Sequence, residues 1–169
     1  MNASLHVNCA IIKHLNLACG LKTALDAEEN PDRPVCLFTE DKALTAAAML
    51  AAAAEGSPQL LLPYALNLNV LQDIQATTGA RRVITDLPDL LPSTMTPVAA
   101  APRPFPSDGF QAAAADKVIV SLFTGGTTGT PQVWPKTLAN LFGEAFFMVT
   151  HFNLSPADCF VANTVPYHI

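Results

Sequence analysis

The sequence predicts an α/β fold in which a mostly parallel β-sheet is flanked by helices. Short apolar runs that suit buried strands alternate with longer segments of helical periodicity. The 169 residues are 50% hydrophobic and only 14% charged, against about 25% charged in a typical domain. This length and composition suit one domain with a sizeable core. Strands that alternate with helices of this length form parallel sheets covered by helices.

The first three elements follow from simple patterns. Apolar residues spaced along 4–28 favour a helix, and the proline-containing stretch 30–34 ends it. Residues 35–39 form a short apolar run typical of a strand. Residues 42–55 are rich in alanine and favour a second helix, which Gly56 is expected to end.

The alternation continues to residue 85, so 1–85 is predicted to be one strand–helix region. Residues 59–62 are an apolar run that favours a strand. Residues 67–78 carry leucine and isoleucine at helical spacing, and Gly79 is expected to end this helix. Residues 82–85 favour another short strand.

Residues 86–116 have a different composition. Six of the 14 prolines fall within 86–106, and an alanine-rich piece follows. This composition predicts a connector that crosses the surface. Its stretch 102–106 is also compatible with a ligand for a proline-reading domain, but we favour the stiff connector.

Residues 117–169 return to regular structure. A run of apolar residues and β-formers predicts a buried strand over 118–123. A short strand is expected over 132–135, and a helix is expected to start near Thr137, which suits the N-cap. That helix carries Phe142, Phe146 and Phe147, which we expect in the core. One more strand is expected over 159–162.

Between the first two of these strands lies a threonine- and glycine-rich run, 124–131, which reads TGGTTGTP. Glycines let a ligand approach the backbone, successive backbone N–H groups can form an anion-binding concavity, and threonine hydroxyls add donors. The run therefore predicts a phosphate-binding loop, with a plain glycine-rich turn as the alternative. It lacks the Gly-Lys pair of the ATPase P-loop and the GxGxxG that opens a helix in dinucleotide-binding folds.

Residues 124–141 resemble the signature loop of the adenylate-forming superfamily, which includes acyl-CoA synthetases, aryl-CoA ligases and adenylation domains of nonribosomal peptide synthetases. The family pattern, S/T-S/G-G-S/T-T-G-x-P-K-G-V-x-x-T-H-x-N-L, aligns without a gap. The end of the chain, 166–169, is similar to the start of the family's P-x-H-x-x-G motif. The resemblance implies that residues 1–169 are part of the large N-terminal domain of such an enzyme. The matched loop positions are Thr124, Gly125, Gly126, Thr127, Thr128, Gly129, Pro131, Thr137, Asn140 and Leu141.

The resemblance also implies roles for these residues. The threonines Thr124, Thr127 and Thr128 would donate hydroxyl groups to phosphate, and the three loop glycines would supply backbone N–H groups and room. The acyl-pocket candidates are Tyr167 and His168, where His168 matches the motif histidine; a capping or core histidine is the alternative.

Three positions depart from the family pattern. The loop lysine, which in the family helps to hold the β- and γ-phosphates, is Gln132 here and brings no charge. We expect Lys136, four residues further on, to supply the missing cation. Trp134 and Leu138 also stand where the family has an aliphatic residue and a histidine.

The function that the resemblance implies is that of an AMP-dependent acyl or aryl acid ligase. Such an enzyme uses ATP and Mg²⁺ to turn a carboxylic acid into an acyl adenylate, releases pyrophosphate, and passes the acyl group to the thiol of CoA or of an acyl carrier protein. The family's adenine-binding motifs and C-terminal domain lie downstream of P-x-H-x-x-G, so residues 1–169 alone are expected to be an inactive N-terminal piece. A non-enzymatic nucleotide- or phosphate-binding module is the alternative, and a structural fragment is a third reading.

Charge and hydropathy exclude several other classes. A net charge of −5 and the lack of a basic cluster argue against nucleic acid as a partner. The longest apolar run, 43–54, is too short for a membrane span, which needs about 20 residues, and no convincing signal peptide is present, so we expect a cytoplasmic protein. The four cysteines form no CxxC, so we predict no metal site. Exposed apolar faces with little charge predict self-association as a homodimer.

Overall fold

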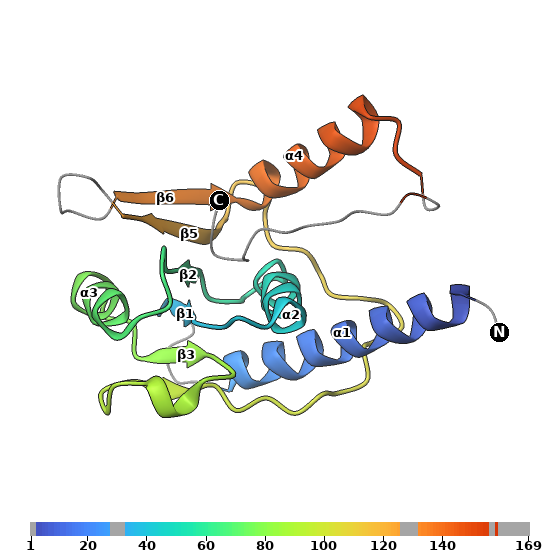
Figure 1. Cartoon of the computed structure of the whole chain (residues 1–169). Coiled ribbons are helices and arrows are strands. Elements are labelled where there is room, and N and C mark those ends of the chain that lie inside the picture. Colours follow the sequence, from blue (N-terminus) through green and yellow to red (C-terminus); the bar gives the residue numbers. More distant parts are fainter. Residues whose placement is uncertain (1–2, 28–32, 126–131, 156–157, 159–169) are drawn as a thin grey trace.

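The computed structural model describes residues 3–27, 33–125, 132–155 and 158, and it has the predicted α/β architecture. A six-stranded sheet in the order β4-β3-β1-β2-β5-β6 lies between helices (Figure 1). In chain order, the elements are α1 (Ala3–Asp26), β1 (Val35–Leu37), α2 (Lys42–Ala52), β2 (Leu60–Leu62), α3 (Leu68–Thr78), β3 (Arg82–Ile84), the 3-10 helix η1 (Pro88–Leu90), β4 (Thr96–Pro97), β5 (Val118–Thr124), β6 (Gln132–Thr137) and α4 (Leu138–His151).

The sheet is mostly parallel, as the alternation of strands and helices predicts. Strand β1 is central and pairs in parallel with β2 on one side and β3 on the other. Strand β5 continues the parallel sheet next to β2, whereas the edge strand β6 runs antiparallel to β5. The crossover from β1 to β2 places α2 on one face, and the crossover from β2 to β3 places α3 on the opposite face (Figure 1).

Two apolar cores follow from the period-two alternation of side chains along the strands. On one face, Val35 and Leu37 of β1 and Leu60 of β2 are buried under α1 and α2. On the other face, Cys36 and Phe38 are buried under α3. Helices α1 and α2 lie against each other. The buried side chains of α2 are all small: Ala47, Ala48, Ala51 and Ala52.

Side-chain caps explain where three of the helices begin. The carboxylate of Asp41 accepts hydrogen bonds from the backbone N–H groups of Ala43 and Leu44, at 2.7 and 3.3 Å, and so caps α2. Asn67 caps α3 in the same way by accepting from Val70. Helix α4 begins with a capping box of Thr137 and Asn140, which confirms the N-cap expected there.

The ends of the helices agree with the prediction less uniformly. Gly79 takes a left-handed conformation with φ of 71° directly after α3, as predicted. Gly56 also has a positive φ, but α2 already ends at Ala52 rather than Glu55. After α2 the backbone pairs with a segment that is distant in sequence, because Ala54 forms an isolated antiparallel bridge with Ala112.

Residues 86–116 are more than the surface connector that their composition predicts. They contain η1 and the two-residue strand β4, which pairs in parallel with β3 and forms one edge of the sheet. Met95 is buried against the α3 face and Ala113 against the α1–α2 face. The high proline content predicted a connector and so hid this strand. An edge strand can include a proline such as Pro97, because it tolerates a residue that lacks an N–H group.

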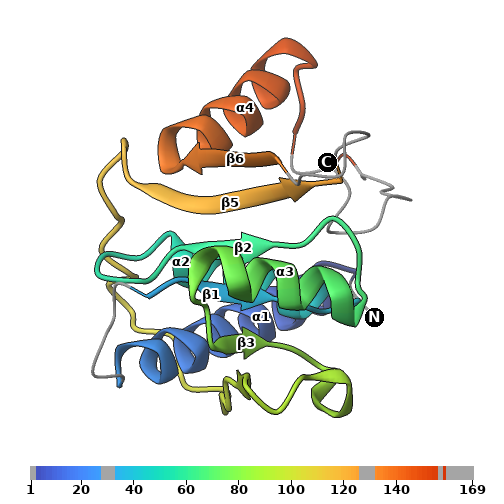
Figure 2. The same ribbon diagram turned by 90° about the vertical axis from the view of Figure 1, so that its left-hand side faces the viewer.

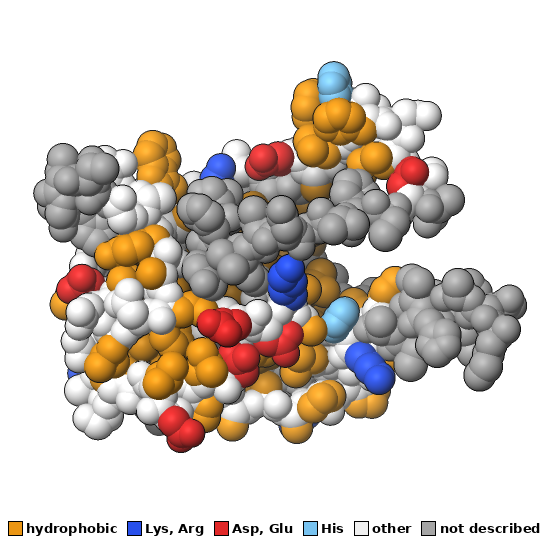
Figure 3. Space-filling view, viewed as in Figure 1, with side chains coloured by type: hydrophobic (Ala, Val, Ile, Leu, Met, Phe, Trp, Pro, Cys, Tyr) orange, Lys and Arg blue, Asp and Glu red, His pale blue; other side chains and the backbone are white. Residues whose placement is uncertain are grey.

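The expectation that the phenylalanines of α4 lie in the core is wrong for this chain. The exposed fractions of Phe142, Phe146 and Phe147 are 57%, 73% and 60%. Among the described residues, only the first part of α4 packs on the sheet, through half-buried Leu138 and Leu141. Figure 3 shows apolar side chains gathered at the far end of this helix. The apolar pattern signalled a surface suited to burial without identifying what would cover it.

The buried thiol of Cys36 gives a testable consequence of the packing. Burial raises the pKa of this thiol from 9.0 to about 12. We expect alkylating reagents at pH 8 to leave native Cys36 unmodified while half-buried Cys19 reacts. Because the folded state holds the Cys36 proton more tightly, its contribution to stability is full below pH 9 and is lost as pH rises from 9 toward 12. Peptide mapping after alkylation checks this; equal rates at the two cysteines would contradict it.

Candidate phosphate-binding site

The loop that resembles a phosphate-binding motif begins at the carboxyl edge of the parallel sheet. Strands β2 and β5 are paired with Leu62 opposite Leu122, so the segments that follow them leave the sheet side by side. Figure 2 shows the arrows of β1, β2, β3 and β5 pointing the same way, toward this edge. Ligands of open α/β sheets bind at the carboxyl ends of the strands, so the position suits a ligand-binding loop.

The two segments are in direct contact through Tyr64 and Gly125. A Cβ atom built on Gly125 would lie 3.1 Å from both Cδ2 and Cε2 of the Tyr64 ring. Gly125 does not have a positive φ. The glycine is therefore required here by the close approach of the ring and not by a left-handed backbone.

The antiparallel pairing of β5 with β6 fixes both ends of the loop. Thr124 lies opposite Gln132, and the ladder continues as far as Val118 opposite Thr137. The strand β6 is thus longer than the predicted 132–135. It is an exposed edge strand, and Val133 and Trp134 are about half exposed.

The extended form of β6 determines where Lys136 lies. Its backbone is opposite Val120, four residues along the strand from Gln132. Four residues of an extended strand span about 13 Å, and residues an even number apart share a face. Lys136 is therefore on the same face as Gln132 but far from the end of the ladder at which the loop begins. Its predicted role as the replacement cation stays a prediction.

Several predicted site residues lie outside the described part of the chain. These are the loop residues Gly126, Thr127, Thr128 and Gly129 and the acyl-pocket candidates Tyr167 and His168. The strand expected over 159–162 also lies there. Of the predicted phosphate site, the structure places Thr124, Gly125, Gln132 and Lys136.

The described ends of the loop supply hydrogen-bond donors and no charge. Thr124 is half-buried and carries a hydroxyl group, Gly125 is exposed directly after the strand, and Gln132 carries an exposed amide. Among the residues that the structure describes, no group of three histidine, cysteine or carboxylate side chains is placed to hold a metal ion.

Sequence reasoning missed Tyr64. It belongs to no motif, and it is half-buried against the core under α3. The available signal was its position, because it stands two residues after a strand whose parallel neighbour carries the loop. This position predicts a contact only when the order of the strands is known, and local sequence patterns do not give that order.

No protein-family model matches the chain, and no curated protein matches it. Solved structures do match. Apo MatB from Rhodopseudomonas palustris superimposes with a TM-score of 0.72 at 19% identity, over 92% of this chain and 34% of MatB. The o-succinylbenzoate CoA synthetase MenE from Bacillus subtilis, in complex with its acyl-adenylate intermediate, gives 0.66 at 14% identity over 92% and 42%. The N-terminal subdomain of NpsA from Klebsiella oxytoca gives 0.54 at 16% over 73% and 35%.

At these identities the likeness concerns the fold. The chain spans between 34% and 42% of the length of the three structures. In the part that the structure describes, no helix is both long and apolar enough to cross a bilayer. The chain has the fold of the N-terminal region of the adenylate-forming enzymes, as its threonine–glycine loop predicts.

Proposed function

We propose that residues 1–169 carry the phosphate-binding loop of an AMP-dependent acyl or aryl acid ligase. The observation that carries the proposal is the place of the loop. It leaves β5 at the carboxyl edge of a sheet that superimposes on the CoA synthetase MenE, whose structure holds an acyl-adenylate intermediate. The chain's own loop sequence, TGGTTGTP, supports the same function independently of the fold.

The proposed reaction explains why a loop of this composition is needed. A carboxylate is a poor acyl donor because its leaving group would be oxide. ATP, with Mg²⁺, converts it to an acyl adenylate and releases pyrophosphate, and a thiol of CoA or of an acyl carrier protein then displaces AMP. The loop residues 124–129 would hold the β- and γ-phosphates and stabilise the negative charge that develops as pyrophosphate leaves.

Trapping the intermediate tests this function. The complete reading frame that contains residues 1–169 is incubated with ATP, Mg²⁺, hydroxylamine and a panel of aryl and fatty acids. Hydroxamate that depends on both ATP and one class of acid supports adenylation, and thioester formation with CoA or a carrier protein then identifies the acceptor. Residues 1–169 alone are expected to form no hydroxamate. No hydroxamate from the complete protein with any acid would contradict the proposal.

Gln132 favours a second candidate function. Because it replaces a charged lysine by a neutral amide, the loop can bind phosphate without the cation that supports catalysis. A non-enzymatic module would bind ATP, by calorimetry, in a complete protein that forms no adenylate. Measurable ATP binding together with adenylate formation would exclude that candidate.

The positive charge of Lys136, which lies four residues along β6 from Gln132, gives a further prediction. If Lys136 replaces the loop lysine, Lys136→Met weakens the apparent affinity of the complete protein for ATP by roughly fivefold or more, because a partly screened charge pair is lost. Lys13→Met is the matched control. It removes the same charge from an exposed position on α1. Equal KM values for ATP in wild type and Lys136→Met would remove this role from Lys136.

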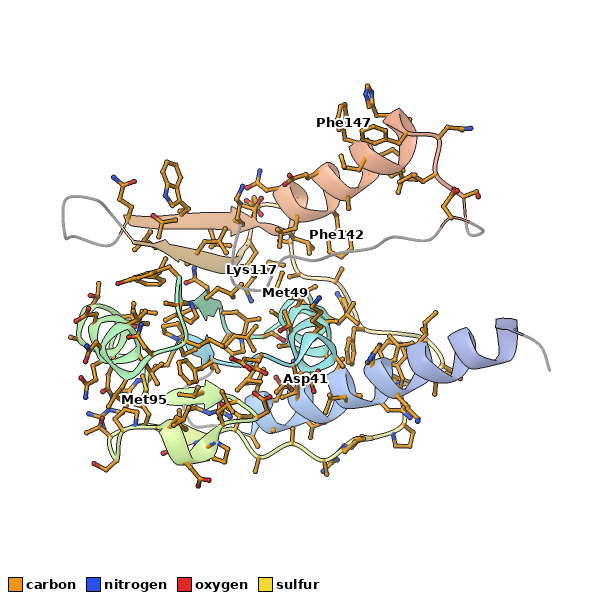
Figure 4. All side chains as sticks on the ribbon, in the orientation of Figure 1. Asp41, Met49, Met95, Lys117, Phe142 and Phe147 are labelled. Carbon is orange, nitrogen blue, oxygen red and sulfur yellow. The ribbon has the colours of Figure 1, made fainter. Side chains whose placement is uncertain are left out.

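We also propose that the 169-residue chain forms a homodimer through α4. Helix α4 has a single acidic residue, Glu144, and its apolar side chains lie on more than one side. Figure 4 shows Phe142 on the side that faces α2 and Met49, and Phe147 on the side turned away. The exposed apolar residues of this surface are Phe142, Phe146, Phe147, Met148, Val149 and Phe152.

Sedimentation velocity checks this self-association over a range of concentrations. We expect the wild-type chain to associate and the double variant Phe146→Asp, Phe147→Asp to sediment as a monomer, because large exposed apolar patches associate and buried charges oppose it. Leu90→Asp is the control, since Leu90 is also an exposed apolar residue, at 55%, but lies on η1. A wild-type chain that stays monomeric at all concentrations would contradict the proposal.

A further inference from the structure

The contact between Tyr64 and Gly125 joins two segments that are distant in sequence at the point where the loop leaves the sheet. We propose that Tyr64 is a positioning residue: its ring fixes the backbone at Thr124 and Gly125, and thereby the direction in which the phosphate-binding loop starts. This inference rests on the proposed function of the loop.

Tyr64 can serve as a fixed point because its own segment is tied down on both sides. It follows β2, whose three leucines are buried, and the intervening Pro63 is also buried. Three residues later, Asn67 caps α3 through its hydrogen bond to the backbone of Val70, at 3.0 Å. The ring itself packs against the core under α3. Moving a ring held in this way would disturb its packing on the core beneath it.

Gly125 lies one residue beyond the last pair of the ladder between β5 and β6. Phe123 is buried, and Thr124 is the last residue of β5 that the ladder with β6 holds, opposite Gln132. Gly125 follows directly and is exposed. The Tyr64 ring is thus placed to hold the backbone one residue beyond the end of the ladder.

The geometry makes the two residues mutually dependent. An alanine Cβ at 125 would lie 3.1 Å from two ring carbons, whereas carbon atoms in good contact are about 3.5–4.0 Å apart. The backbone or the ring would have to move by a few tenths of an ångström. If the ring is absent, the same alanine has room, so the effect of Gly125→Ala on the loop should disappear.

A double-mutant cycle in the complete protein tests this dependence. The variants are Tyr64→Ala, Gly125→Ala and both together, and the readout is KM for ATP against kcat in carboxylate-dependent ATP–pyrophosphate exchange. We expect each single variant to raise KM for ATP by roughly tenfold, because small displacements of a binding loop are costly. In the Tyr64→Ala background, Gly125→Ala should add less than about twofold.

Two controls separate positioning from general stability. Tyr64→Phe retains the ring and should retain the wild-type KM for ATP, whereas Tyr64→Leu retains an apolar side chain without the ring and should raise it. Thermal unfolding of each variant shows that it is folded, and KM for the carboxylic acid should stay unchanged in all of them. Gly143→Ala, which adds a Cβ to open space on α4, should leave exchange unaltered.

The outcomes distinguish this inference from the function on which it rests. A wild-type protein without exchange overturns the proposed function, and the positioning role falls with it. The positioning role alone is overturned if the wild-type protein exchanges and Gly125→Ala raises KM for ATP by the same factor with and without the Tyr64 ring. Equal KM values for Tyr64→Leu and wild type would do the same.

Discussion

Replacing Gly20 by alanine is expected to destabilise the chain by about 3 kcal/mol, because it inserts an atom where another part of the backbone already lies. The added Cβ would be 2.0 Å from the carbonyl oxygen of Ala101 and 2.8 Å from its carbonyl carbon. The segment that contains Ala101 is held against α1, since Asn16 of α1 accepts hydrogen bonds from the backbone N–H groups of Arg103 and Phe105. Helix α1 would have to separate from this segment.

Gly143→Ala is the matched control, since it also adds a methyl group to a helix. No atom lies within 4 Å of the Cβ position at Gly143, so alanine should stabilise α4 by about 0.5–1 kcal/mol. Urea unfolding followed by circular dichroism measures both changes. Equal free energies of unfolding for Gly20→Ala and wild type would contradict the packing of α1 described above.

The second large effect is expected in the loop itself. Changing Thr127 and Thr128 together to alanine should lower ATP–pyrophosphate exchange by the complete protein by about 100-fold or more, because positioned donors to a developing charge are lost. These residues lie between Thr124 and Gln132, which the structure places opposite each other at the carboxyl edge of the sheet. Thermal unfolding of the variant checks that the loss of exchange does not come from a loss of stability.

Thr77→Ala is the control for this pair. Thr77 is exposed near the end of α3, where its hydroxyl group donates to the carbonyl oxygen of Asp73. It should alter exchange by less than twofold. Undiminished exchange in the Thr127, Thr128 variant would mean that the run is only a turn, and it would favour a structural role for residues 124–131.

Local patterns predicted the elements that have strong local signals. The helix over 67–78 was correct because a capping asparagine and a left-handed glycine mark its ends. The strand over 118–123 was correct because a buried strand needs a continuous apolar run. Strand β4 was missed because two residues, one of them proline, carry no periodicity. The pairing of β1 with both β2 and β3 depends on crossovers that no local pattern specifies.

For the candidate site, the sequence predicts the residues, and the structure places only Thr124, Gly125, Gln132 and Lys136 of them. A motif identified the residues from Thr124 to Gln132, and the structure confirms that a strand pair holds the two ends. The contact of Tyr64 with Gly125 joins the segments that follow the neighbouring strands β2 and β5, and it can be predicted only when the strand order is known. The exposed phenylalanines of α4 show the converse, because an apolar pattern indicates that a surface is suited to burial but not which chain buries it.

Carboxylate-dependent ATP–pyrophosphate exchange is the most direct test of the central claim. The complete reading frame and residues 1–169 are assayed in parallel with labelled pyrophosphate across aryl and fatty acids. We predict exchange by the complete protein, dependent on one class of acid and on Mg²⁺, and none by residues 1–169. Absence of exchange by the folded complete protein with every acid would contradict the claim and would mean that a loop with Gln132 in place of lysine has kept its fold without the reaction.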